Sequence, residues 1–358
     1  MIFIFFTYGI IFLIEIILIA SFLIKFKAYE AKAIADTHLS ILVCARDEES
    51  NLPQLLDSLL ASNYPLSEIE ILVGDDHSSD GTANVIRKYS SENPIIRYVP
   101  IEHEKDGLIA KGNVLAQLVD QSKYKKVLII DADIHVDQQW MSTMSGLLEH
   151  FELVSGYTMI DEMSDRVGDQ FFDWIVVLHT MKAMSDAFQP ISILGNNMGF
   201  RLSAYDQVNG FRGLGATDVE DLGLLKSFQK GGYKTFQFMG AQGVAYTKAQ
   251  KGYGSLLNQR VRWMNGVFTH HWLLAIPAFF ARLWFFTGTI AFIFSKWAVI
   301  ILVLGFVANY IKYVQVMSKS GSFQKFRIIT PASISLLDTF AFLHRIFIGK
   351  VKWKGRKF

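Results

Sequence analysis

The sequence has few charged residues and a single cysteine. Asp, Glu, Lys and Arg make up 19% of the 358 residues, and 51% are hydrophobic, whereas soluble domains usually carry about 25% charged residues. This composition excludes a disordered chain and disfavours a purely soluble enzyme. Cys44 alone forms neither a disulfide framework nor a Cys-rich zinc site. The net charge of +2 provides no basic field, so we expect no nucleic-acid partner.

The apolar residues are concentrated towards the two ends of the chain. Residues 2–24 contain one charged side chain, Glu15, and about 20 apolar residues in a helix are enough to span a bilayer. Basic residues follow this run, which favours an uncleaved anchor over a secretory signal and places the next domain in the cytoplasm. We therefore predict a transmembrane anchor at residues 1–24 of a multi-pass protein of the cell (inner) membrane.

Residues 270–358 are predicted to form a second membrane region. Two stretches approach spanning length: residues 272–294 and 297–317. A third stretch, 328–348, contains polar residues, and the basic tail after it is expected to stay in the cytoplasm. Two arrangements meet this condition. One is a two-helix hairpin followed by an interfacial or re-entrant segment, and the other is a single span near 283–305 with 328–348 as the return.

Two ionisable side chains lie inside the predicted membrane segments at similar depths, Glu15 and Arg282. An unpaired charge within a bilayer is costly, so such residues are normally paired. We therefore expect an ion pair between Glu15 and Arg282. The alternative is a protonated Glu15 next to a water defect.

Residues 38–265 are predicted to form a cytoplasmic α/β domain. Short apolar runs at 39–45, 69–74 and 127–130 alternate with helix-like stretches, a pattern typical of βαβ units and a mostly parallel sheet. Ligands of such sheets bind at the carboxyl ends of the strands. Polar clusters follow all three runs, so the functional site is expected at this edge.

The cluster after the third run is Asp131-Ala132-Asp133. Two carboxylates this close repel each other unless a cation lies between them. Mg²⁺ and Mn²⁺ suit oxygen ligands of this kind, particularly where a phosphate completes the coordination. The pattern thus favours a divalent-metal site at Asp131 and Asp133, with a solvated turn as the alternative.

Other polar positions have both a structural and a functional interpretation. Asp76, after the second run, could accept hydrogen bonds from a base or a ribose. The charged loop that contains Arg46 and Glu48 could be an ordinary surface loop. Lys111 at a helix start could hold an anion or lie on the surface. The acidic residues at 218–221 precede a helix, where acidic side chains are favoured anyway.

The last motif is Gln259-Arg260-Val261-Arg262-Trp263. Gln259 and Arg262 are three residues apart and share a helix face, with Trp263 adjacent. A guanidinium and an indole suit a diphosphate and a sugar, or else anchor a helix at a membrane interface.

Taken in order, these motifs resemble the membrane-bound family 2 glycosyltransferases, which include ceramide glucosyltransferase-like and cellulose, hyaluronan and poly-N-acetylglucosamine synthase-like enzymes. The match extends from about residue 39 to residue 263. It implies a GT-A fold flanked by transmembrane helices. It also implies a nucleotide-sugar donor (usually a UDP-sugar), Mg²⁺ or Mn²⁺, and transfer with inversion.

The resemblance also implies roles for individual residues. Those expected to bind the donor are Arg46, Glu48, Asp76, Lys111 and Asp131. The metal would be bound by Asp131 and Asp133, and the diphosphate and acceptor by Gln259, Arg262 and Trp263. Asp221 would be the general base with Glu220 beside it, although the spacing lets Asp218 compete. Family members commonly have Asn where Asp47 stands, which leaves the role of Asp47 open.

The expected function is transfer of a sugar to a membrane lipid at the cytoplasmic face. The Gln259–Trp263 motif leads directly into an apolar stretch, which places the acceptor at the bilayer surface, and polymer-exporting relatives usually have more membrane helices. The alternative within the family is a processive polysaccharide synthase, for which an oligomer could build a channel. A non-catalytic nucleotide-sugar-binding membrane component would be expected to lack some of these motifs. A nucleotidyltransferase would need a glycine-rich loop where Arg46–Glu48 stands.

Overall fold

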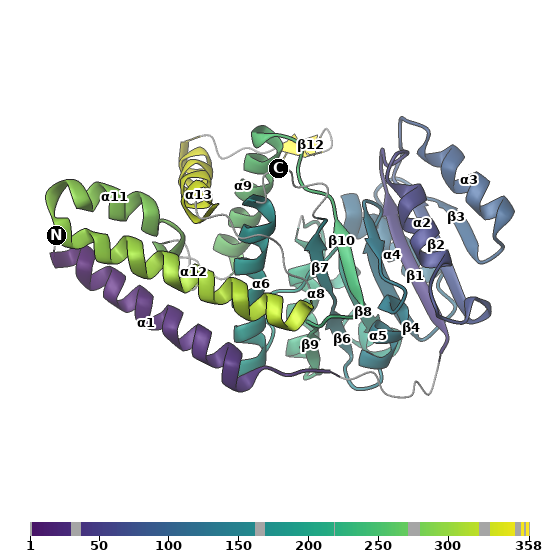
Figure 1. Cartoon of the computed structure of the whole chain (residues 1–358). Coiled ribbons are helices and arrows are strands. Elements are labelled where there is room, and N and C mark those ends of the chain that lie inside the picture. The colour runs from purple at the N-terminus through teal and green to yellow at the C-terminus, as the bar shows by residue number, and fades with distance from the viewer. Residues whose placement is uncertain are drawn as a thin grey trace.

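The structure is a computed structural model that describes residues 2–29, 37–161, 169–217, 219–270, 280–321, 330–347, 352–353 and 356–357. Helices cover a central β-sheet, and a group of apolar helices extends away from one side of it (Figure 1).

The central sheet contains seven strands in the order β3-β2-β1-β4-β8-β6-β9. They are β1 (Leu39–Ala45), β2 (Ile69–Asp75), β3 (Ile96–Pro100), β4 (Lys126–Asp131), β6 (Leu153–Ser155), β8 (Asn197–Arg201) and β9 (Thr235–Gln237). β1, β2 and β4 are short apolar runs buried along nearly their whole length, as expected for parallel strands covered on both faces. Only β8 runs antiparallel to its neighbours, so the prediction of a mostly parallel sheet is confirmed.

Two hydrophobic clusters occupy the two faces of this sheet. Ile41 and Val43 of β1 point into one cluster, and Leu42 between them points into the other, because successive side chains of a strand alternate between faces. The helices that follow the strands are α2 (Leu52–Leu60), α3 (Thr82–Glu92), α4 (Ala110–Asp120), α5 (Trp140–Leu147), α6 (Asp169–Ala187), α7 (Leu202–Gln207) and α8 (Glu220–Lys230). A second sheet, in the order β5-β10-β7, consists of β5 (Ile134–Val136), β10 (Val244–Thr247) and β7 (Tyr157–Ile160).

The remaining helices are α1 (Ile2–Lys25), α9 (Tyr253–His270), α11 (Trp284–Phe294), α12 (Val299–Ser320) and α13 (Thr330–Phe347). By length and composition, α1 and the helical segment Lys296–Ser320 could each cross a membrane, and α11 is a shorter apolar helix. Figure 1 shows α1 and α12 side by side, and both contact α6. Part of the stretch predicted at 272–294 lies outside the described residues, and the three domain boundaries remain predictions.

The carboxyl end of α1 is part of the larger hydrophobic cluster, on the face of the sheet to which Ile41 and Val43 point. Phe22 is 1% exposed and belongs to the larger hydrophobic cluster. Beyond the helix, the backbone N–H of Lys27 donates to Oδ2 of Asp186 at 2.9 Å. The N-terminal helix therefore packs directly against the α/β domain.

The expected pair between Glu15 and Arg282 is wrong. Glu15 forms an ion pair with Lys312 of α12, whereas Arg282 pairs with Asp173 and Asp338. The reason lies in the axial alignment of the helices. The hydroxyl of Tyr8 donates to the carbonyl of residue 280 at 3.3 Å, so the segment before α11 is level with Tyr8, about two helical turns or 10 Å from Glu15.

Candidate active site

Three loops meet at one edge of the sheet. The parallel register pairs Ala45 with Asp75 and Cys44 with Asp131, so β1, β2 and β4 end at the same level. Because β8 runs in the opposite direction, the residues that precede it, Gly195 and Asn196, lie at this edge as well. The topology thus gathers side chains from four separate segments.

Lys111 lies at the centre of this group, in the first turn of α4. Its Nζ is 2.6 Å from Oδ1 of Asp131 and 3.8 Å from Oε1 of Glu220, and it donates to the carbonyl of Gly195 at 2.9 Å. Burial lowers the pKa of Lys111, but the two carboxylates outweigh burial and hold the pKa above its ordinary value. Lys111 is therefore a permanent cation that joins the end of β4 to the start of α8.

Asp221 is held in one orientation by two backbone donors. Its Oδ2 accepts from the N–H of Gly195 at 3.1 Å, and its Oδ1 accepts from the N–H of Leu222 at 2.7 Å. Burial raises the pKa of Asp221, and these hydrogen bonds oppose the shift. Sequence reasoning did not assign a role to Gly195, since its contact with Asp221 depends on the tertiary fold.

The pKa of the neighbouring Glu220 is raised as well. Burial raises the pKa of Glu220 to about 7, with Lys111 opposing the shift and Asp221 adding to it. A buried carboxyl that titrates near neutrality is suited to accepting a proton at physiological pH. Asp218, the competing candidate for the base, lies outside the described residues.

The loop after β1 is bound closely to the loop after β2. Oδ1 of Asp47 accepts from the N–H of Ser79 at 2.7 Å and from its hydroxyl at 3.1 Å. Oε2 of Glu49 accepts from the N–H of Gly81 at 3.0 Å, and Oγ1 of Thr82 accepts from the N–H of Glu48 at 2.8 Å. The backbone and side chains of the charged loop are thus hydrogen-bonded to the loop after β2.

Three of the predicted donor-binding residues lie in these two loops. Nη1 of Arg46 donates to the carbonyl of Asp76 at 3.2 Å and lies 3.4 Å from its Oδ2. The side chain of Glu48 is buried, and its Oε2 accepts from Nδ2 of Asn51 at 2.7 Å. Asp76 is buried too and lines a hollow of about 240 Å³ between the β2 loop and the segment after β3. His77 and His103 stack at this hollow with ring centroids 4.0 Å apart.

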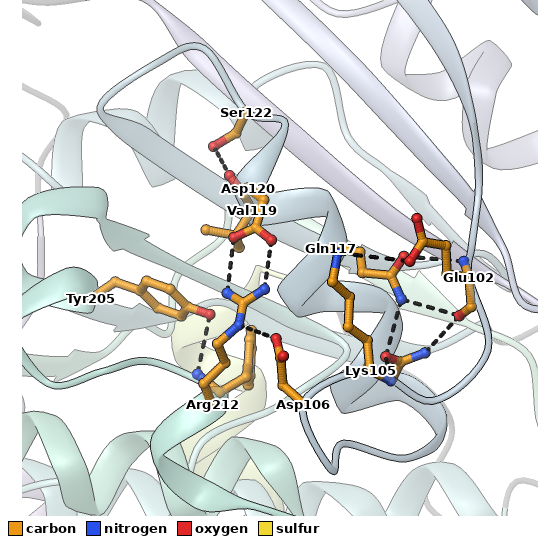
Figure 2. Close-up of polar contacts among 11 residues, drawn as sticks. Glu102, Lys105, Asp106, Gln117, Val119, Asp120, Ser122, Tyr205 and Arg212 are labelled. Carbon is orange, nitrogen blue, oxygen red and sulfur yellow. Dashed lines mark hydrogen bonds and ion pairs between the residues drawn. The ribbon is translucent and has the colours of Figure 1, made fainter.

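The segment from residue 101 to 109 is held on both sides (Figure 2). Nδ2 of Asn113 and Nε2 of Gln117, both from α4, donate to the carbonyl of Glu102 at 3.2 and 3.1 Å. On the other side, Arg212 donates from Nε to Asp106 at 2.6 Å and makes a bidentate pair with Asp120 at 2.9 and 2.6 Å. Arg212 lies in the short 3₁₀ helix Arg212–Leu214, and no signal in the sequence marked it.

The carboxylates at the end of β4 are compatible with a divalent metal that also binds a phosphate. Asp131 is paired with Lys111, and Asp133 is half-buried just before β5. Among the residues that the structure describes, no three His, Cys, Asp or Glu side chains group as a metal shell. One or two protein carboxylates are the usual contribution where substrate phosphates complete a Mg²⁺ shell.

The Gln259–Trp263 motif lies on α9. Gln259 and Arg262 are half-buried, and the ring of Trp263 packs 5.1 Å from that of Trp174 on α6. Nε1 of Trp174 donates to the carbonyl of Thr158 at 2.7 Å. The Thr158 hydroxyl lies 3.4 Å from Oδ1 of Asn196. The carbonyl of Asn196 in turn accepts from the N–H of Asp131 at 3.3 Å, so a continuous series of contacts joins α9 to the end of β4.

The mostly parallel sheet, with acidic and basic side chains gathered at its carboxyl edge, is the architecture expected of the class of GT-A glycosyltransferases. Within this class, the chain belongs to glycosyl transferase family 21, whose family model matches residues 6–358. The resemblance to family 2-type glycosyltransferases and the assignment as an enzyme are thereby confirmed.

Characterised relatives match parts of the chain. The poly-β-1,6-N-acetyl-D-glucosamine synthase of Staphylococcus aureus is 27% identical over 237 residues, which are 64% of this chain and 54% of the relative. Glycosyltransferase AglE of Haloferax volcanii is 30% identical over 112 residues, 30% of this chain and 36% of the relative. The chain thus spans about half or less of the length of these relatives.

Among solved structures, the mannosyltransferase PcManGT from Pyrobaculum calidifontis, in complex with GDP-Man and Mn²⁺, has a TM-score of 0.59. The two chains are 15% identical, and the match covers 96% of this chain and 95% of the mannosyltransferase. This likeness concerns the fold, and it confirms the expected GT-A architecture.

Proposed function

We propose that this glycosyltransferase moves a sugar from a UDP-sugar to a membrane lipid at the cytoplasmic face, with inversion and with Mg²⁺ or Mn²⁺. The observation that carries the proposal is the cluster of Lys111, Asp131, Glu220 and Asp221. It combines a permanent cation, a carboxylate at the donor end and a fixed carboxylate that can accept a proton.

In the proposed reaction Asp221 is the general base. It takes the proton of the acceptor hydroxyl while that oxygen attacks the anomeric carbon from the face opposite the departing nucleoside diphosphate. The bond from the anomeric carbon to the diphosphate breaks as the new glycosidic bond forms, which inverts the configuration. Gly195 and Leu222 hold the carboxylate in place through their N–H groups.

The leaving group accumulates negative charge, which the site would neutralise. A divalent ion bound by Asp131 and Asp133 would supply most of this neutralisation when present. Arg262 is proposed to assist from α9, because a guanidinium matches the geometry of phosphate oxygens. Arg46, Glu48 and Asp76 are proposed to bind the nucleoside, since Asp76 lines the hollow between the loop after β2 and the segment after β3, and Arg46 contacts Asp76.

A lipid acceptor is supported by the position of α9. This helix carries Gln259, Arg262 and Trp263, and it packs against α13, which in turn contacts α11. In the described part of the chain, only two helices are long and apolar enough to cross a membrane. Two such helices are few for a polymer channel, so we favour a single transfer to a lipid over polymer synthesis and export.

A cytoplasmic orientation is supported by the charges where α1 and α12 approach the α/β domain. Lys25 ends the first helix and Lys27 follows it, and Nζ of Lys319 near the end of α12 lies 4.8 Å from the ring centroid of Phe26. Basic residues at membrane ends favour the cytoplasmic side.

The test uses the full chain in nanodiscs made with a total bacterial polar lipid extract. Radiolabelled UDP-sugars and GDP-mannose are supplied with Mg²⁺, Mn²⁺ or EDTA. Label that enters organic solvent in the wild type, is lost with EDTA and is lost in Asp221→Asn supports the proposal. The matched control is Asp57→Asn, since Asp57 is an exposed carboxylate that accepts from Tyr89.

The second candidate is a polysaccharide synthase, favoured by the similarity to the poly-N-acetylglucosamine synthase. Label in an aqueous product of mixed sizes would establish this function instead of the lipid transfer. Donor binding without turnover across the panel would overturn both and leave a non-catalytic binding component.

A further inference from the structure

Four charged side chains form one cluster between the α/β domain and the apolar helices. Asp173 of α6 pairs with Arg260 of α9 and with Arg282 just before α11, and Arg282 also pairs with Asp338 of α13. The side chains are 1%, 6%, 23% and 2% exposed in the order Asp173, Arg260, Arg282, Asp338. We call these four residues the charge quartet.

The charge quartet constrains the geometry of the helices. Two positive and two negative groups balance, but removing one partner of a buried pair leaves an uncompensated charge. The charges are compensated only while α6, α9, α13 and the segment before α11 keep their relative positions. The charge quartet therefore fixes α9, α13 and the segment before α11 against α6 of the α/β domain.

In the contact between α6 and α9, two aromatic side chains lie beside the charged pair. Trp174 follows Asp173 on α6, and Trp263 is one turn beyond Arg260 on α9. The two indoles pack 5.1 Å apart, and the guanidinium of Arg260 lies 4.7 Å from the ring centroid of Trp263. Arg260 therefore pairs with Asp173 and at the same time lies over the ring of Trp263.

We propose that Arg260 is a positioning residue for sugar transfer: held by Asp173, it fixes the indole of Trp263 at the acceptor end of the site. The inference rests on the proposed acceptor role of Trp263. Through Arg282 and Asp338 the same contact ties the position of Trp263 to the apolar helices. The series Trp174–Thr158–Asn196 then relates this position to the end of β4.

The main test compares Arg260→Met with the wild type in the nanodisc assay. We expect transfer of label to lipid to fall at least tenfold in kcat, while the donor KM and the release of nucleoside diphosphate to water stay within twofold. The ratio of hydrolysis to transfer therefore rises. Arg260→Lys keeps the positive charge opposite Asp173 but removes the guanidinium over the ring of Trp263, so it should give an intermediate ratio.

The matched control is Lys182→Met. It breaks the other buried ion pair of α6, between Lys182 and Asp186 at 2.9 Å, whose side chains are 0% and 1% exposed. This pair has no contact with α9 in the part of the chain that the structure describes. Lys182→Met should lower the Tm as much as Arg260→Met does, without changing the ratio. An equal change of ratio in both variants would overturn the proposal and leave a merely structural role.

A second measurement does not depend on turnover. The emission spectrum of Trp263 is obtained by subtracting the spectrum of the same protein that also carries Trp263→Phe. We expect this emission to shift to longer wavelength in Arg260→Met and to stay unchanged in Lys182→Met. Emission unchanged in Arg260→Met would overturn the positioning role. If the wild type turns over no donor, the proposed function fails while this spectral test still decides the role of Arg260.

Discussion

Glu220 and Asp221 are adjacent, half-buried and next to Lys111, so their titrations are coupled. Burial raises the pKa of Glu220 to about 7 and also raises the pKa of Asp221. A base must be deprotonated to act, so the transfer rate should rise with pH as this coupled pair of carboxyls loses its protons. Glu220→Gln removes one negative neighbour of Asp221, and we expect the rising limb of the kcat profile to move about one pH unit lower.

The same substitution should alter stability in a defined direction. Since the folded pKa of Glu220 exceeds its ordinary value of 4.5, the folded state binds more protons than the unfolded state between that value and about 7. Through this group, stability falls as pH rises across that window. Glu220→Gln should flatten that slope in a series of Tm measurements. If Glu220→Gln showed the same kcat–pH profile and the same pH dependence of the Tm as the wild type, the raised pKa of Glu220 would be contradicted.

Gly195 also controls the position of the proposed base, because a side chain at Gly195 would collide with Asp221. An added Cβ would lie 2.7 Å from Oδ2 and 2.8 Å from Cβ of Asp221. Gly195→Ala should move the carboxylate and lower kcat about 10- to 100-fold, with the donor Kd within twofold of the wild type. Gly112→Ala is the matched control, because its added Cβ would meet only Cβ of Glu220 at 3.9 Å. A kcat for Gly195→Ala close to that of the control would be the contrary result.

At the scale of elements, the loops after β1 and β2 act as one unit. Asp47 accepts two hydrogen bonds from Ser79 and has a φ of 53°, in the left-handed region that Asn and Asp adopt more readily than most other residues. We expect Asp47→Asn to retain donor affinity, whereas Asp47→Ala should raise the donor Kd several-fold and destabilise the fold by about 1–3 kcal/mol. Equilibrium donor binding and unfolding of both variants test this, and equal behaviour of the two would contradict it.

These elements also show how far the sequence leads. The runs at β1, β2 and β4 are short and apolar, with acidic residues just beyond them, and this pattern was enough to predict a parallel sheet with a site at its carboxyl edge. The antiparallel β8 was not predicted, because its direction depends on pairing with β4 and β6. The hydrogen bond from Gly195 to Asp221 follows from that direction, so it could not be derived from the local sequence.

Partners distant in sequence were the hardest to predict. Gln259, Arg262 and Trp263 were singled out by spacing alone, whereas Arg260 between them contacts an aspartate on α6 that no periodicity connects to it. Glu15 was assigned the wrong partner because depth within an apolar run was the only guide. The structure gives it Lys312, which lies on the helix packed alongside α1.

At the scale of the whole molecule, that ion pair joins the two long apolar helices. Lys312 is 4% and Glu15 13% exposed in their side chains. Glu15→Gln should destabilise the protein by about 3–5 kcal/mol, because it leaves the lysine charge buried without its partner. Adding Lys312→Met should restore most of the loss, measured as thermal unfolding in nanodiscs. Lys296→Gln, at an exposed lysine, serves as the control, and a double variant no more stable than the single one would argue against the pair.

The burial of Phe22 has a consequence for how the protein can be made and handled. Because the last turns of α1 fill part of the core beneath the sheet, the first helix is a structural component of the catalytic domain. A chain shortened to begin at residue 37 would lack a buried aromatic side chain, and emptying such a site costs about 3–5 kcal/mol. Purification of a fragment without α1 is therefore expected to yield an unstable product, because the α/β domain needs this helix to complete its core.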